Sequence, residues 1–364
     1  IIQGNIMKKT IIASMAVSAL SLTTMSHAMT SLDDHDLSQI SGQALLNLQN
    51  ISGVSSGSMN QSNMGFYRLS LEGQLSLNAN IKKLQLGCGG SKGSGACDID
   101  IDNISLTGIT TSTAAGAGVD TDFILNNPFI EFAIDNPNSA STRSIAGFRL
   151  GALSALGVMS IGSNTDLNST TDDTGINTLS GDIGVRVTNA TLTDVSACLI
   201  STTAGCWLNG TANVADYSTT LVARRASSFS LKGMTAQASS SLLGLKLTNV
   251  NMNNVPYSNT HQLLIAGIDG NGNYVATGNA SLSLQSKDIY WQNVSDGSWR
   301  TIAAEKGWWI SLPTTQFANL QITQPVKLNA FDAIGGALGQ VVDLAAVDLG
   351  QQPISNCYGG VKFC

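Results

Sequence analysis

The chain is poor in charge, in aromatic side chains and in histidine. Charged residues make up 12% of its 364 residues and aromatic residues 5%, and only three histidines occur. The formal net charge is −6, so there is no basic field that could hold a phosphate backbone or an anionic membrane surface. We therefore expect no nucleic-acid partner.

The usual signatures of catalysis and cofactor binding are also missing. No HExxH, Walker or Rossmann sequence occurs, and a histidine-based site would depend on His261 alone. Asp98, Asp100 and Asp102 alternate along one predicted strand and could bind a cation or act as acid and base. The commoner interpretation is a solvated face that protects a strand edge with charge. We expect no enzyme, no cofactor and no metal site.

An apolar run that could enter a membrane occurs only near the beginning of the sequence. Lys8 and Lys9 precede an apolar segment at 11–22, and small residues follow up to Ala28. This arrangement is typical of a secretory signal peptide that is cleaved between Ala28 and Met29. The run is shorter than the roughly 20 residues of a membrane-spanning helix, so we expect an exported chain without a transmembrane segment.

The six cysteines form three close couples along the sequence. The couples are Cys88 with Cys97, Cys198 with Cys206, and Cys357 with Cys364. An even count in an exported chain favours disulfides, and the absence of any CxxC pair disfavours zinc. Six cysteines allow many connectivities, so the pairing within each couple is predicted from spacing alone.

Period-two alternation runs through most of the chain, as in GQLSLNANI, CDIDIDNISLTG and FIEFAI. Apolar residues at alternate positions predict half-buried strands. For residues 44–364 we expect an all-β, elongated antiparallel sandwich or roll, built as one large domain or two packed subdomains. Helical spacing at 330–350 predicts a short helix there, although its glycines weaken it.

An asparagine recurs in similar surroundings at Asn103, Asn189, Asn249 and Asn319. Asparagine tolerates the left-handed conformation that a bulge requires, so the recurrence could mark a reused corner. Chance matches in an asparagine-rich β protein explain it equally well, and both interpretations stay open.

The phrases SLDDHDLSQISGQALL, CDIDIDNISLTG and NPFIEFAIDNPNSASTRSIAGFRLG are similar to the FilA-like pilus-system proteins of gammaproteobacteria. The resemblance covers nearly the whole chain. It implies a component of a fimbria-like system that lies in the periplasm, at the cell surface or in the fimbrium, and that is encoded beside a C39-type peptidase. It implies no catalytic residues.

A C39-type peptidase as partner gives residues 29–43 a second meaning. Such peptidases read leaders by apolar residues at fixed positions before a small pair. The matching residues are Leu32, Asp36, Leu37, Ile40, Gly42 and Gln43, with cleavage expected after Gln43. Gln43 departs from the small residue expected there. A short amphipathic N-terminal helix, with Ser31 as its cap, is the simpler interpretation of the same spacing.

These patterns together predict three regions and one main function. Residues 1–28 are upstream residues plus the signal peptide, residues 29–43 an acidic leader-like segment, and residues 44–364 the β body. We expect a structural or accessory component of a bacterial surface filament, with adhesion among its roles and with other pilus-system proteins or copies of itself as partners. The alternative is a periplasmic binding or adaptor module whose apolar β surface holds a lipid or a pilus subunit.

Overall fold

The fold is known from a computed structural model that describes twelve ranges of the chain. These are residues 45–89, 96–109, 121–162, 175–198, 206–227, 229–239, 246–252, 255–256, 260–317, 320–322, 326–329 and 341–342. Their regular structure consists of strands alone, which confirms the all-β prediction. The chain divides into the units Ile1–Leu45 and Leu46–Cys364, and the described strands belong to the second. No membrane-spanning helix is found in the described part of the chain.

The larger sheet has thirteen strands. Its main path follows β1 (Leu46–Ser52), β4 (Met64–Leu71), β8 (Phe123–Asp135), β9 (Ser144–Ile161), β18 (Thr260–Ile265), β23 (Gly307–Phe317), β10 (Ile176–Val187), β7 (Ile99–Thr107) and β6 (Ala79–Leu86). Four more strands join it: β5 (Gln74–Leu77) on β8, β13 (Tyr217–Ala226) on β10, β21 (Thr277–Gly278) on β9, and β22 (Ser281–Gln285) between β9 and β23.

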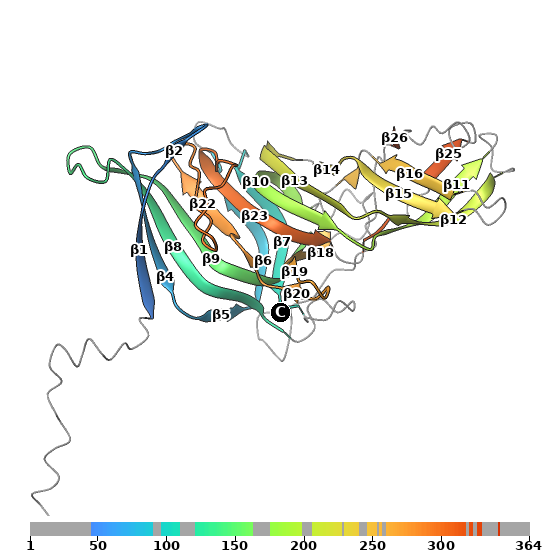
Figure 1. Ribbon diagram of the computed structural model, residues 1–364, viewed down its shortest axis with the longest axis horizontal. Coiled ribbons are helices and arrows are strands. Elements are labelled where there is room, and N and C mark those ends of the chain that lie inside the picture. Colours follow the sequence, from blue (N-terminus) through green and yellow to red (C-terminus); the bar gives the residue numbers. More distant parts are fainter. Residues whose placement is uncertain are drawn as a thin grey trace, which may run out of the picture. The chain divides into compact units, whose positions relative to one another are not determined.

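The large sheet curves back on itself. β7 pairs with both β10 and β9, so β9, β18, β23, β10 and β7 form a closed cycle of hydrogen-bonded strands. The long strands β8 and β9 run side by side and bend along their length (Figure 1). Within β8, Asn127 has a φ of 45°, and its backbone N–H donates to the carbonyl of Gly73 in the β4–β5 turn at 2.8 Å. The curvature of the long strands makes one face of the sheet concave (Figure 1).

The second sheet has seven strands. It contains β24 (Gln321–Ile322), β11 (Thr191–Cys198), β12 (Cys206–Val214), β15 (Met234–Ser239), β16 (Lys246–Met252), β26 (Val341–Val342) and β25 (Val326–Asn329). Three two-stranded pairs complete the described strands: β2 (Ser55–Ser56) with β3 (Met59–Asn60), β14 (Ser230–Leu231) with β17 (Val255–Pro256), and β19 (Gly267–Ile268) with β20 (Tyr274–Val275).

Most strand pairs are antiparallel, as the sequence predicted, but four are parallel. These are β10 with β23, β11 with β24, β11 with β25, and β16 with β26. The partners in each pair come from distant parts of the chain, and alternation within one strand contains no information about such partners.

The two predicted helices fall wholly or mostly outside the described residues. Within 330–350 the structure describes only Val341 and Val342, which form β26 beside β16. The helical prediction is wrong at these two residues, because pairing with another strand overrides local spacing. The rest of that segment, and the N-terminal helix expected in 29–43, lie outside the described residues.

Two of the four recurring asparagines have the left-handed backbone that a corner motif requires. Asn103 in β7 has a φ of 48°, and Asn189 between β10 and β11 has a φ of 55°. Asn249 lies in β16 and is not among the described residues with a positive φ. Asn319 lies outside the described residues.

Candidate functional site

A row of aliphatic side chains crosses six strands of the large sheet at one register. Its members are Leu48, Leu69, Ile130, Leu150, Leu282 and Ile310, each the direct partner of the next. We call them the aliphatic row. Because direct partners lie on the same face, the row forms a continuous apolar stripe across β1, β4, β8, β9, β22 and β23.

A second row lies two residues further along the same strands and on the same face. Its members are Tyr67, Phe132, Phe148, Leu284 and Trp308, again in direct register. We call them the aromatic row. The rings of Phe132 and Phe148 lie 6.0 Å apart between their centroids, so the row is packed side by side rather than scattered.

This face, which we call the apolar face, is exposed to an unusual degree. Nine of the twelve large apolar side chains that the described ranges leave exposed belong to it, including Leu69 at 42%, Ile130 at 41% and Leu150 at 40%. Single exposed apolar residues are normal, whereas contiguous exposed apolar patches are typical of interaction surfaces and ligand-binding grooves.

The apolar face is hollowed into a groove of about 640 Å³. Of the 22 described residues that line it, only Ser281 has a polar side chain. The floor is made of buried residues such as Phe123, Ala155 and Leu312, whereas the rim carries the exposed side chains of the aliphatic row. Gly151 lies in the wall, where a Cβ would stand 2.7 Å from the ring of Phe129, so a glycine is needed for the two strands to lie this close.

The opposite face of the same strands carries polar and charged residues, and it is buried on β4, β8, β9, β22 and β23, whereas its member on β1, Gln49, is exposed. Its central row, here the charged row, consists of Gln49, Arg68, Glu131, Arg149, Ser283 and Trp309. Glu131 is 0% exposed and lies between Arg68, at 3.3 Å, and Arg149, whose Nε donates to it at 2.9 Å. Burial lowers the pKa of the Arg149 guanidinium, and the contact with Glu131 opposes that shift.

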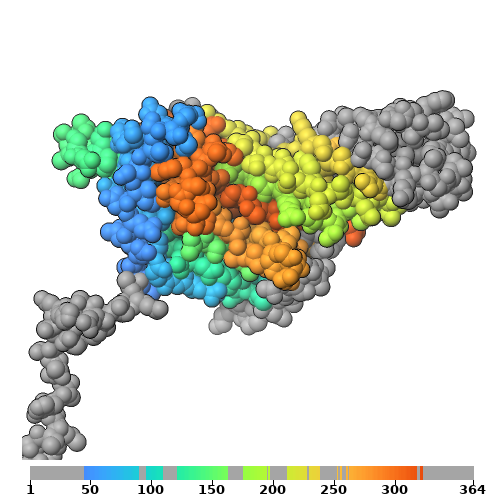
Figure 2. Space-filling view, in the orientation of Figure 1, coloured from blue at the N-terminus to red at the C-terminus, as the bar shows by residue number. Residues whose placement is uncertain are grey.

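The connection between β22 and β23 is the layer that buries the charged row. Its residues Ile289, Trp291 and Ala304 pack with Phe66 and Trp309 in one apolar cluster. The Trp291 ring lies 4.9 Å below the Arg149 guanidinium. Figure 2 shows this connection in orange beside the blue residues of β1 to β4. The covered side of the sheet is therefore the charged one, and the open side is the apolar one.

The predicted cysteine couples are only partly described. Cys88 and Cys97 form a disulfide, as predicted. Cys198 and Cys206 are direct partners in the β11–β12 register, and their side chains lie outside the description. Cys357 and Cys364 lie outside the described residues, so the second and third couples stay predictions.

Asp100 and Asp102 on β7 and Asp98 just before it are buried, so the expectation of a solvated face is wrong. Asp98, Asp100 and Asp102 are 2%, 8% and 5% exposed. Their charges are matched by neighbours: Arg225 donates to Asp98 at 2.8 Å and Lys83 to Asp102 at 2.9 Å.

These partners explain why the aspartates can be buried. Gln85 and Asn177 donate further hydrogen bonds to the second and third carboxylates, and the hydrogen bond to Asp102 raises the pKa of Lys83. Among the described residues, no group of three His, Cys, Asp or Glu side chains is placed to hold a metal ion.

Two further polar residues, Asp269 and His261, lie in a turn and in a strand. Asp269 lies in the β19–β20 turn, where its Oδ1 accepts hydrogen bonds from the backbone N–H groups of Asn271, at 2.9 Å, and Asn273, at 2.8 Å. These hydrogen bonds, of which that from the Asn273 backbone has the largest effect, lower the pKa of Asp269. The strands on either side of the turn, β19 and β20, pair antiparallel. His261 lies in β18.

The residues predicted for export and cleavage lie outside the described part of the chain. They are Ala28, Met29, Leu32, Asp36, Leu37, Ile40, Gly42 and Gln43.

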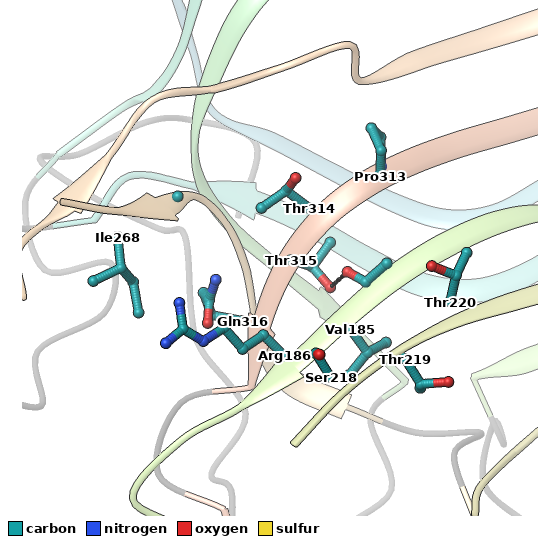
Figure 3. Close-up of a pocket in the computed structure, with 12 residues that line it drawn as sticks. Val185, Arg186, Ser218, Thr219, Thr220, Ile268, Pro313, Thr314, Thr315 and Gln316 are labelled. Atoms are coloured by element: carbon teal, nitrogen blue, oxygen red, sulfur yellow. Dashed lines mark hydrogen bonds between the residues drawn. The ribbon is translucent and has the colours of Figure 1, made fainter. Parts of the chain in front are cut away.

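A second pocket, of about 550 Å³, lies over β10, β13 and β23. Figure 3 shows its lining, which includes the Arg186 side chain and the hydroxyl groups of Ser218, Thr219, Thr220 and Thr314. Apolar side chains such as Val185, Ile268 and Pro313 also line it, so its lining is mixed, whereas that of the groove is almost entirely apolar.

Comparison with protein-family models, with curated proteins and with solved structures finds no match to this chain. The site therefore rests on its own geometry. Sequence reasoning identified the strands that carry the groove but did not assemble the groove residues, because the aliphatic row joins positions up to 262 residues apart, from Leu48 to Ile310.

Proposed function

We propose that the chain binds a hydrocarbon ligand, such as the acyl chain of a lipid or fatty acid, in the groove on the apolar face. The observation that carries this proposal is the composition of the groove, in which one serine is the only polar side chain among the 22 lining residues that the structure describes. It corresponds to the lipid-binding module that the sequence suggested as the alternative function.

The lining selects for ligands that have no polar groups of their own inside the groove. A buried polar group without a hydrogen-bond partner costs several kcal/mol, roughly 2–7, and the groove offers almost no such partner. A methylene chain has no polar group that would need a partner, and each CH₂ that it buries contributes about 0.8 kcal/mol to binding.

The size of the groove also suits such a ligand. Pockets for small molecules usually span about 300–1,000 Å³, and this groove measures about 640 Å³. Its floor of buried side chains and its exposed rim provide depth for a chain to enter and an opening through which a polar headgroup can stay in water.

Calorimetry with soluble fatty acids, used below their micelle-forming concentration, tests this function. We expect the affinity to rise by about fourfold for each added methylene from octanoate to laurate. Leu150→Asp places a charge in the rim and should abolish binding. The matched control is Val222→Asp, because Val222 is 52% exposed and lies on β13, away from the groove. Affinity that is independent of chain length, or equal loss in both variants, would contradict the proposal.

A second candidate is the filament component expected from the sequence, and strand β1 favours it. Among the described strands β1 pairs only with β4, so its outer edge is free, and its side chain Leu48 is 73% exposed. A free edge of this length can accept a strand from another subunit through main-chain hydrogen bonds. Electron microscopy of cell surfaces with wild-type protein and with Leu48→Lys tests it: unchanged fibres in the variant would count against edge pairing.

The proposed setting is outside the cytoplasm for both candidates. The Cys88–Cys97 disulfide supports an oxidising compartment, in agreement with the expected signal peptide. We propose no enzyme activity for the chain.

A further inference from the structure

We propose that the aromatic row docks this protein on the surface of a lipid bilayer with zwitterionic headgroups, so that an acyl chain passes from the bilayer into the groove. This inference rests on the proposed hydrocarbon-binding function and names the source of the ligand. It concerns residues that do not line the groove, because none of Tyr67, Phe132, Phe148, Leu284 and Trp308 belongs to its wall.

The position of the aromatic row is the first argument. It lies two residues beyond the aliphatic row on the same strands, which places it beside the groove and on the same face. A membrane contact at this row would therefore bring the end of the groove to the bilayer surface.

The chemistry of the row is the second argument. Tyrosine and tryptophan combine an apolar ring with a polar tip and gather at membrane interfaces, where one end is dry and the other wet. Phe132 and Leu284 are 40% and 38% exposed, so their apolar parts are available for insertion. Ile145 extends the patch, since it pairs with Ile134 next to the row and is 65% exposed.

The charge of the apolar face determines the kind of bilayer. Neither the aliphatic row nor the aromatic row contains a Lys, Arg, Asp or Glu, and the chain has a net charge of −6. Electrostatic attraction to anionic lipids requires basic residues near the surface. Insertion of apolar side chains into a zwitterionic interface needs none.

Flotation with phosphatidylcholine vesicles tests the docking surface. We expect wild-type protein to float with the vesicles, and the variant Phe132→Ser/Leu284→Ser to partition less by about tenfold or more. Val222→Ser/Val275→Ser is the matched control, since it removes two exposed apolar side chains away from this face. Urea denaturation of each variant verifies that it is folded. Equal partition of the two variants would overturn the proposal.

Laurate binding in vesicle-free buffer separates this inference from the function on which it rests. Phe132→Ser/Leu284→Ser should bind laurate as wild type does, because neither residue lines the groove. If wild type floats in a row-dependent manner but binds no laurate, the hydrocarbon function fails and docking stands. If wild type binds laurate but flotation does not depend on the row, docking fails alone. A dimer that dissociates in Phe132→Ser/Leu284→Ser would show that a second copy covers the face, and would also overturn docking.

Discussion

Glu131→Gln is the substitution that most sharply tests the buried charged row. Glu131 is the only acidic member of that row, and it lies between two guanidinium groups that are 3% and 1% exposed. Replacing it with glutamine keeps the shape and leaves two buried positive charges without a counter-ion. Breaking a buried ion pair in this way costs about 3–5 kcal/mol.

Arg68→Met should destabilise the protein less than Glu131→Gln, because it leaves no unpaired buried charge. The row has two arginines and one glutamate, so removing Arg68 leaves Glu131 and Arg149 as a neutral pair that keeps the 2.9 Å hydrogen bond from Arg149 Nε. The cost is then the lost hydrogen bonds and the lost contact with the Phe129 ring, which lies 5.3 Å from the Arg68 guanidinium. We expect about 1–2 kcal/mol for Arg68→Met.

Urea denaturation measures both costs. With a slope near 3 kcal/mol/M, Glu131→Gln should lower the midpoint by about 1 M or more without changing the slope. Glu305→Gln is the matched control, because its pair with Arg224, at 3.2 Å, has side chains 35% and 56% exposed, and exposed pairs contribute about 0–1 kcal/mol. If Glu131→Gln costs no more than Arg68→Met, the reasoning from net buried charge is refuted.

Three further predictions concern the cysteines, a turn and the N-terminus. Mass mapping of unreduced protein should join Cys88 to Cys97, Cys198 to Cys206 and Cys357 to Cys364, and a crossed linkage would contradict this pairing. Replacing the first couple with serines should lower the free energy of unfolding by about 2–3 kcal/mol but leave the protein folded. NMR titration should place the pKa of Asp269 below the ordinary value for aspartate. The hydrogen bonds of its turn then stabilise the fold at pH values above the ordinary pKa of aspartate, and this stabilisation is lost as the pH falls through the lowered pKa. An ordinary or raised pKa would count against the turn hydrogen bonds. N-terminal sequencing of exported protein should find Ala44 if the leader-like segment is cleaved, with Leu37→Asp leaving a start at Met29; a Met29 start in wild type, with an active peptidase present, would end the leader hypothesis.

The strands could be predicted from sequence because alternation is a local property. FYRLSL and FIEFAI, in which apolar and polar residues alternate, lie in β4 and β8. Left-handed asparagines at Asn103 and Asn189 also follow from local chemistry.

The side of each strand that faces the interior could not be predicted in the same way. Alternation suggests that Leu69 and Ile130 are buried and that Arg68 and Glu131 face water, and the structure has the reverse. The charged side is buried because the distant β22–β23 connection covers it and because the three charges neutralise most of one another. No pattern within a single strand contains this information, so the groove emerges only when the strands are assembled.

Methyl-resolved NMR with laurate tests the central claim, that the open face of the large sheet binds an acyl chain, most directly. Ile130 and Ile310 belong to the groove lining, whereas Ile289 is buried on the charged side of the same sheet. We predict that laurate shifts the methyl signals of Ile130 and Ile310 in a saturable manner and leaves that of Ile289 unchanged. Saturable shifts at Ile289 without shifts at Ile130 and Ile310, or no shifts at any of them, would contradict the account.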